Sequence, residues 1–120
     1  MSINSYTKDN ILTIQLLDER LMDEGQLKRI YTDMIVLLDK TTEQQVVLNF
    51  SKVQFMSSAM LGKLVQVHKK CKEYKVKLKL CGISPEIYEV FKITRLHKLF
   101  DIESDAASAR KAFSKRGLFG

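Results

Sequence analysis

The chain has 120 residues, of which 45% are hydrophobic, and its formal net charge is +6. This length suits one domain with a buried core, and no hydrophobic run approaches the roughly 18 residues that a membrane span requires. The first residues also lack the basic-then-hydrophobic layout of a signal peptide. We therefore expect one domain over residues 1–120 that is cytoplasmic and does not insert into a membrane. The sequence leaves the oligomeric state open.

The first part of the chain predicts two strands followed by a helix. The segment from Asn10 to Leu17 has the composition of a strand, and a shorter strand around Ile3 to Thr7 is expected to pair with it through a polar turn. Asp23 and Gln26 then have the spacing of a helix capping box. A one-sided hydrophobic pattern follows and predicts a helix that ends near residue 40.

The central segment predicts a buried strand that leads into a serine-led helix. Val46 to Phe50 is a continuous hydrophobic run, and hydrophobic residues recur at helical spacing from Ser57 to about Glu73. Ser57 and Ser58 therefore lie beside the unpaired N–H groups and the positive dipole end of a helix. Such a hydroxyl can cap the helix, hold an anion or carry a phosphate. Capping needs only one serine, and we expect Ser57 to be the cap.

The next strand carries much of the positive charge. In K-V-K-L-K-L, Lys75, Lys77 and Lys79 alternate strictly with hydrophobic residues up to Cys81, which predicts one buried and one solvated strand face. No aromatic residues interleave these lysines to stack on bases, so no specific nucleic-acid partner is expected. A solvated basic face can instead steer the protein toward an acidic partner.

The last part of the chain predicts a helix, a strand and a final helix. Gly82 is expected to turn the chain, Ser84 to cap a helix, and Pro85 to occupy its first position. A strand is expected over residues 99–102 and a helix over about 104–116. Alternating strands and helices predict an α/β fold: one mixed sheet of four to five strands and about four helices, mostly on one face because the lysine face is solvated.

No residue pattern in the chain is typical of a catalytic site. A zinc site could use Cys71, Cys81 and His68, but the sequence offers no fourth ligand at a suitable spacing. A catalytic cysteine paired with His68 or His97 has equally little support. Gly62 is a single helix glycine, which is expected to allow close packing rather than to cradle a phosphate. We therefore expect an interaction module that is not an enzyme and holds neither a metal nor a cofactor.

Two segments resemble the STAS domain family (sulfate transporter and anti-sigma factor antagonist). The stretch N-F-S-K-V-Q-F-M-S-S-A-M-L-G matches without a gap the family's strand, loop and helix start. The segment from Cys81 to Ile102 is similar to the family's closing Ser-Pro-Glu helix and Leu-Phe strand. The resemblance covers about residues 10–105. The matching positions of the first segment are Phe50, Ser51, Val53, Phe55, Ser58, Leu61 and Gly62.

The chain departs from the family pattern close to its functional serine. By the resemblance, Ser58 corresponds to the serine that bacterial anti-sigma factor antagonists phosphorylate. Ser57 replaces the family's preceding Asp, and Met60 replaces a following Gly, with Ala59 between. A hydroxyl at Ser57 supplies less local negative charge than a carboxylate. The resemblance therefore implies phosphorylation at Ser58, slower than in typical members, with Ser57 as a secondary acceptor.

The resemblance also implies a class of partner. Anti-sigma factor antagonists bind an anti-sigma factor, usually a serine kinase. The kinase phosphorylates the antagonist's serine, which ends the interaction, and a phosphatase restores the unphosphorylated form. The expected contact residues are Met56, Ser57, Ser58, Met60 and Lys63, although Met60 fits core packing equally well. Two alternatives remain open: a non-phosphorylated STAS scaffold, or an accessory subunit of a signalling complex or an ABC-type transporter. Nucleotide binding, which some STAS domains show, has no phosphate loop to support it here.

Overall fold

The computed structural model describes residues 3–119, with side chains from 3 to 113. These residues form an α/β domain around a mixed sheet in which only the β1–β2 pair is antiparallel. This confirms the predicted fold class. The sheet has five strands in the order β1 (Ile3–Lys8), β2 (Ile11–Leu16), β4 (Gln45–Asn49), β6 (Lys77–Cys81) and β7 (Asp101–Glu103).

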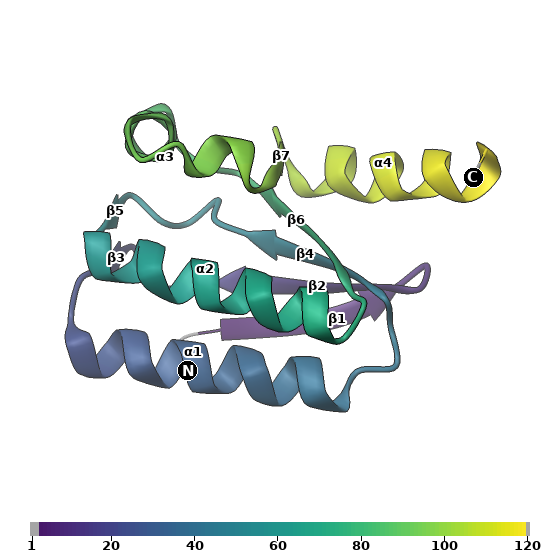
Figure 1. The fold of residues 1–120 in the computed structure, drawn as a ribbon, viewed down its shortest axis with the longest axis horizontal. Helices are drawn as coiled ribbons and strands as arrows, with labels where there is room; N and C mark the ends of the chain where they lie inside the picture. Colours follow the sequence, from purple (N-terminus) through teal and green to yellow (C-terminus); the bar gives the residue numbers. More distant parts are fainter. Residues whose placement is uncertain (1–2, 120) are drawn as a thin grey trace.

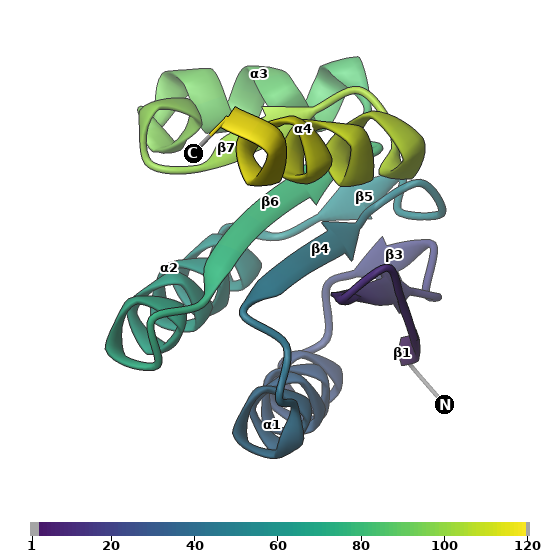
Figure 2. The ribbon, with the colours of Figure 1, turned by 90° about the vertical axis from the view of Figure 1, so that its right-hand side faces the viewer.

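Helices cover both faces of the sheet. α1 (Glu24–Lys40) and α2 (Ser58–Glu73) lie side by side on one face (Figure 1). α3 (Pro85–Ile93) joins the same core through Ile87 and Phe91 and continues into a short 3-10 turn, η1 (Leu96–Lys98). α4 (Ala106–Phe119) packs on the opposite face (Figure 2). Within residues 3–119, no helix is long and hydrophobic enough to cross a membrane.

Several local predictions are confirmed by the backbone geometry. Asp9 and Asn10 join β1 to β2 with positive φ angles of 55° and 65°, as a two-residue hairpin turn requires. At α1, Asp23 accepts a hydrogen bond from the Gln26 N–H, and the Gln26 side chain in return accepts one from the Asp23 N–H. At α3, Ser84 accepts from the Ile87 N–H.

The lysine-bearing strand differs from the prediction. Lys75 and Lys77 are exposed, but Lys79 is only 3% exposed because α4 covers that part of the sheet. Its ammonium lies 3.6 Å from Asp101 Oδ2 and 5.2 Å from the centre of the Phe113 ring. The expectation that all three lysines form a solvated face is therefore wrong at Lys79.

Element boundaries also shift near the end of the chain. The strand expected over residues 99–102 is β7, which begins at Asp101. Leu99 and Phe100 instead follow the turn of η1, because their N–H groups donate to the Leu96 carbonyl at 2.9 and 3.2 Å. The final helix begins at Ala106, and Asp105 caps it by accepting from the Ser108 N–H at 2.7 Å. A second, two-stranded sheet was not predicted. It pairs β3 (Arg20–Leu21) with β5 (Phe55–Met56).

Candidate functional site

The loop between β4 and α2 is held in place by the small β3–β5 sheet. The N–H groups of Gln54 and Phe55 both donate to the Glu19 carbonyl, at 2.8 and 3.1 Å. The Ser57 N–H donates to the Leu21 carbonyl at 2.9 Å. These bonds fix the chain just before α2, so the first turn of α2 emerges at the carboxyl edge of the parallel strands. This is the edge at which α/β folds place their functional loops.

The same loop rests on the chain that leaves β6. The Asn49 side-chain oxygen accepts from the Ser51 N–H at 2.9 Å, which forms a turn directly after β4. Gly82 lies against this turn with a φ of 69°, and an ideal Cβ there would come within 2.9 Å of Asn49 Oδ1 and of Ser51 N. Only glycine allows this approach without displacing the loop. The predicted turn at Gly82 therefore also supports the segment that leads to α2.

The two serines at the start of α2 have different environments. Ser57 occupies the N-cap position with an extended backbone, but its side chain makes no capping hydrogen bond. Its hydroxyl oxygen is buried and has no hydrogen-bond partner among the described residues. Ser58 is the first helical residue and its side chain is exposed. The prediction that Ser57 caps through its hydroxyl is wrong, and of the two hydroxyls only that of Ser58 belongs to an exposed residue.

Because its hydroxyl is buried and caps nothing, Ser57→Ala should not lower the free energy of unfolding by more than about 0.5 kcal/mol. The matched control is Ser84→Ala, because Ser84 is also an N-cap and does accept from a helical N–H, that of Ile87 at 3.3 Å. That control should cost about 1 kcal/mol. Urea titrations of both variants measure the difference, and equal losses would contradict the geometry described for Ser57.

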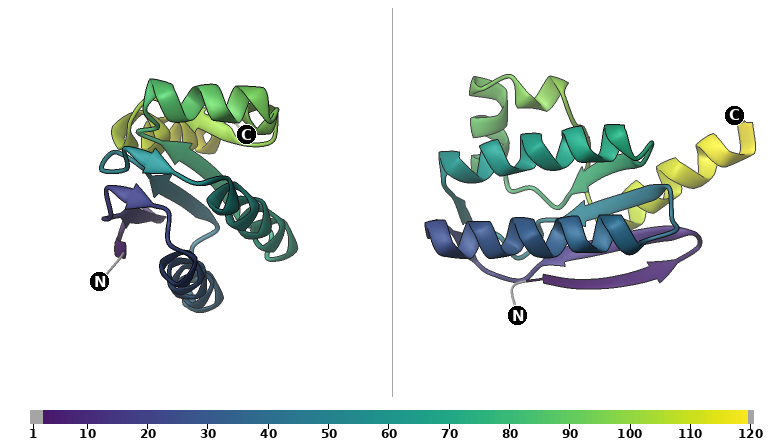
Figure 3. Two further views of the ribbon diagram at one scale, coloured as in Figure 1. Left: turned by 90° about the vertical axis from the view of Figure 1, so that its left-hand side faces the viewer. Right: turned by 60° about the horizontal axis from the view of Figure 1, so that its bottom comes forward.

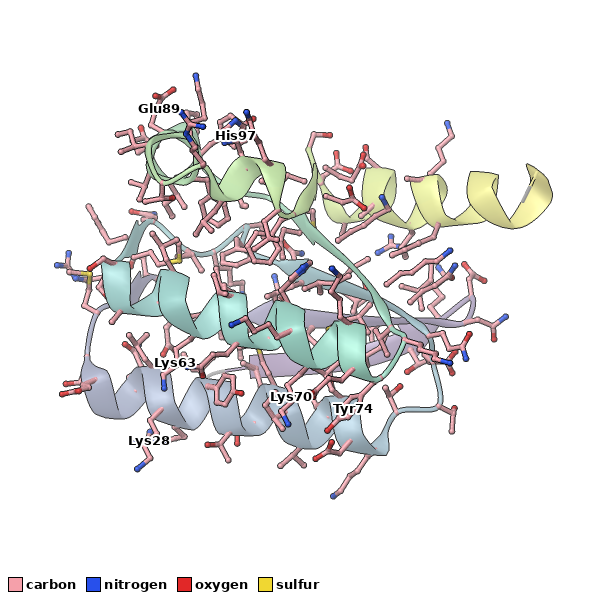
Figure 4. The ribbon with its side chains drawn as sticks, in the orientation of Figure 1. Lys28, Lys63, Lys70, Tyr74, Glu89 and His97 are labelled. Atoms are coloured by element: carbon pink, nitrogen blue, oxygen red, sulfur yellow. The ribbon has the colours of Figure 1, made fainter. Side chains whose placement is uncertain are left out.

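The predicted contact residues are not all accessible. Met56 and Lys63 are half-buried, whereas Met60 is 0% exposed and lies in the main core. Met60 therefore offers no surface to a partner, and its prediction as a contact residue is wrong. The Lys63 ammonium lies 5.2 Å from the centre of the Tyr31 ring, so the side chain bridges α2 to α1 (Figure 4).

Three exposed side chains near this loop did not figure among the predicted site residues. Phe55 is 50% exposed, and the Arg20 guanidinium lies 4.6 Å above its ring centre. Met22, which directly follows β3, is 48% exposed. Phe55 had a signal in the sequence, because it belongs to the matched family motif. Arg20 and Met22 had none, because only the β3–β5 pairing brings their segment to this edge.

The cysteine and histidine residues do not form a site. Cys71 is a buried residue of α2 in the main core, whereas Cys81 lies in the core beneath α4, on the other side of the sheet. Burial raises the pKa of each thiol to about 11, which disfavours the reactive thiolate. Burial, and then the charge of Lys72, lowers the pKa of His68. Among the described residues, no three His, Cys, Asp or Glu side chains are placed to hold a metal ion.

Gly62 lies on the exposed side of α2, one turn after Ser58. An ideal Cβ on Gly62 would meet no atom within 4 Å, so the predicted close packing at this residue is wrong. A glycine inside a helix costs roughly 0.5–1 kcal/mol relative to alanine. Nothing packed against Gly62 within the described residues accounts for this cost.

Comparisons with known proteins give one consistent family. The STAS domain model matches residues 2–109. A Bordetella bronchiseptica protein named as a candidate anti-sigma factor antagonist, BtrV, is 26% identical over 93 residues, which cover 78% of this chain and 79% of BtrV.

Solved structures share the fold. An anti-sigma-factor antagonist (STAS) domain protein from Planctomyces limnophilus superposes with a TM-score of 0.80, at 21% identity over 92% of this chain and 95% of the other. The phosphorylated form of the Bacillus cell-fate determinant SpoIIAA superposes with a TM-score of 0.67, at 15% identity over 92% and 98% of the two chains.

Proposed function

Because the chain belongs to the STAS domain family, we propose that it acts as an anti-sigma factor antagonist. In this proposal it is a binding module and not an enzyme, and its partner is an anti-sigma factor of the serine-kinase type. The kinase phosphorylates Ser58 and so ends the interaction, and a phosphatase reverses the modification. The observation that carries the proposal is the exposed hydroxyl-bearing residue at the first position of α2.

The surroundings of Ser58 support a phosphate that does not disturb the fold. A phosphate adds about −1.5 to −2 charges at pH 7 and accepts several hydrogen bonds. The first turn of α2 contains no acidic residue, so the helix dipole and the free N–H groups there favour an anion. Ser57 is a poorer acceptor because its hydroxyl is buried. SpoIIAA, which has been solved in unphosphorylated and phosphorylated forms, sets a precedent for such a switch on this fold.

The surface around Ser58 also supports docking by a partner. Phe55 and Met56 present hydrophobic side chains on β5, directly before α2. Ala59 and Gly62 put no large side chain on the exposed side of α2, so a partner backbone can approach the helix closely. A phosphate in the centre of this contact would lose water without gaining a positively charged partner, and it would repel acidic groups of the partner protein. Phosphorylation is therefore expected to weaken binding rather than folding.

A pull-down from native lysate with four baits tests the proposal. The baits are the unmodified chain, Ser58→Ala, Ser58→Glu and the control Thr42→Glu. Thr42 is an exposed hydroxyl residue in the loop that enters β4 from the opposite edge of the sheet. An anti-sigma kinase should be retained by every bait except Ser58→Glu, on which its yield should fall at least about tenfold, a loss of about 1.4 kcal/mol.

Two outcomes of the pull-down would contradict the proposal. Equal retention of the same proteins by Ser58→Ala and Ser58→Glu would favour a constitutive STAS scaffold. Retention of a transporter ATPase in place of a kinase would favour an accessory subunit of an ABC-type transporter. Circular dichroism of the four baits separates a binding defect from a folding defect, because all four should keep the same helix content.

A further inference from the structure

The outer edge of β1 offers unpaired backbone groups. β1 is the first strand of the sheet, and within the described residues it pairs only with β2 (Figure 3). Lys8 and Ile11 flank the two-residue turn and are opposite each other. In such a hairpin the flanking pair is hydrogen-bonded and alternate pairs are not. The N–H and C=O groups of Ile3, Ser5 and Thr7 therefore point away from β2, toward the free edge.

This edge lacks the usual protection against pairing. Edge strands are commonly short or carry charged residues or proline. β7, at the opposite edge, has three residues, of which Asp101 and Glu103 are charged. β1 has six residues and carries no charge before Lys8. A strand of this length and composition is open to pairing with another strand.

The helix beside β1, α1, extends this surface with a stripe of residues that differ in charge. Arg29, Asp33, Val36 and Lys40 follow one another at helical spacing along α1. Asp33 and Val36 line a groove of about 340 Å³ between α1 and β1, to which Ser5 also contributes. Val36 is 43% exposed. None of the ion pairs among the described residues uses Asp33 or Lys40.

We propose that this edge binds a second copy of the chain in antiparallel β1–β1 pairing, with the twofold axis at Ser5. Ser5 then faces Ser5 of the second copy, and Ile3 faces its Thr7, so all outward backbone groups of these residues are paired. α1 crosses from β2 back to the parallel strand β4, and therefore runs along β1 in the same direction (Figure 1). The two α1 helices then lie antiparallel across the same axis.

Charge complementarity selects a second copy as the occupant. Ser5 and Val36 line one groove, so a twofold axis at Ser5 also places Val36 near Val36 of the second copy. Asp33 lies three residues before Val36 and Lys40 four residues after it, so each Asp33 faces Lys40 of the other copy. Both ion pairs form in this arrangement alone, because a parallel arrangement would oppose like charges. The proposal uses none of the residues assigned to partner binding and therefore stands independently of the proposed function.

Sedimentation equilibrium of the purified chain tests the dimer. Ser5→Pro removes an outward N–H without removing a bond to β2, and should raise the dimer dissociation constant at least about tenfold. Asp33→Lys and Lys40→Asp should each weaken the dimer, and the double exchange should restore it to within about threefold of the unmodified chain. The control is Lys28→Asp, which lies on α1 outside the stripe and should leave the constant unchanged (Figure 4).

A cross-linking measurement keeps the test decisive if Ser5→Pro affects folding. Opposed residues of a hydrogen-bonded antiparallel pair have Cα atoms about 5.5 Å apart, within the range of a disulfide. Ser5→Cys should therefore form a covalent dimer on mild oxidation, whereas Thr7→Cys, which faces Ile3 of the second copy, should not. A chain that stays monomeric at several hundred micromolar would overturn the proposal. A dimer that Ser5→Pro and both single charge reversals leave unchanged would also overturn it.

Discussion

Truncating Leu64 to alanine should lower the free energy of unfolding by about 2–5 kcal/mol, and Leu48→Ala should cost a similar amount. Leu64 is 0% exposed on the inner side of α2, and Leu48 is 1% exposed in β4. Both side chains belong to the core that joins α1 and α2 to the sheet. Their loss removes hydrophobic contact and leaves a cavity that the surrounding helices and strands fill only in part.

Lys77→Ala is the matched control for these two truncations. Lys77 also lies in a central strand, but its side chain is exposed and makes none of the ion pairs found among the described residues. Its truncation should change stability by no more than about 0.5 kcal/mol. Urea titrations of all three variants, fitted with one common dependence of the unfolding free energy on urea concentration, measure these changes in stability. A loss for Lys77→Ala as large as that for Leu64→Ala would show that the buried and exposed faces are wrongly assigned.

Gly82→Ala should be nearly as damaging although it adds only one methyl group. A residue other than glycine pays about 1–2 kcal/mol for a left-handed conformation, and displacement of the neighbouring backbone adds to this. The Cβ would press on Asn49 Oδ1 and Ser51 N, each 2.9 Å away, in the turn that leads to the site. We expect a total loss of about 2–4 kcal/mol, measured by thermal or urea unfolding.

Gly62→Ala gives the opposite expectation and serves as the control. Gly62 lies inside α2, and its added methyl group would meet nothing within 4 Å. Alanine is the better helix former by up to about 1 kcal/mol, so this substitution should stabilise the protein. If the two glycine substitutions changed stability in the same direction and by equal amounts, the role assigned to the Gly82 turn would be incorrect.

The parts of the fold that were predicted correctly are those with local signals. The Asp23 and Gln26 capping box, the hairpin turn and the Ser84-Pro85 helix start each depend on residues only a few positions apart. The hydrophobic periods of the strands and helices likewise lie within single segments. These signals, together with the family motif, were sufficient for the order of the longer strands and helices along the chain and for the place of Ser58 at a helix start.

The parts that were missed depend on contacts between distant segments. A period-two lysine pattern is the same for a solvated and a covered strand face, and only the packing of α4 buries Lys79. β3 and β5 have two residues each, too few for a pattern, so neither their pairing nor the position of Arg20 over Phe55 was foreseeable. Adjacent serines also look alike in the sequence. Their different burial follows from the chain path that the β3–β5 sheet imposes on Ser57.

Phosphorylation followed by a binding measurement tests the central claim, that Ser58 is the switch of this binding module. The purified chain is incubated with its captured anti-sigma kinase and ATP, the product is mapped by tandem mass spectrometry, and its affinity for the kinase is compared with that of the unmodified chain. We predict one phosphate, located on Ser58, unchanged folding, and binding at least about tenfold weaker, or about 1.4 kcal/mol. Modification at another residue, or equal affinity of the two forms, would contradict the account.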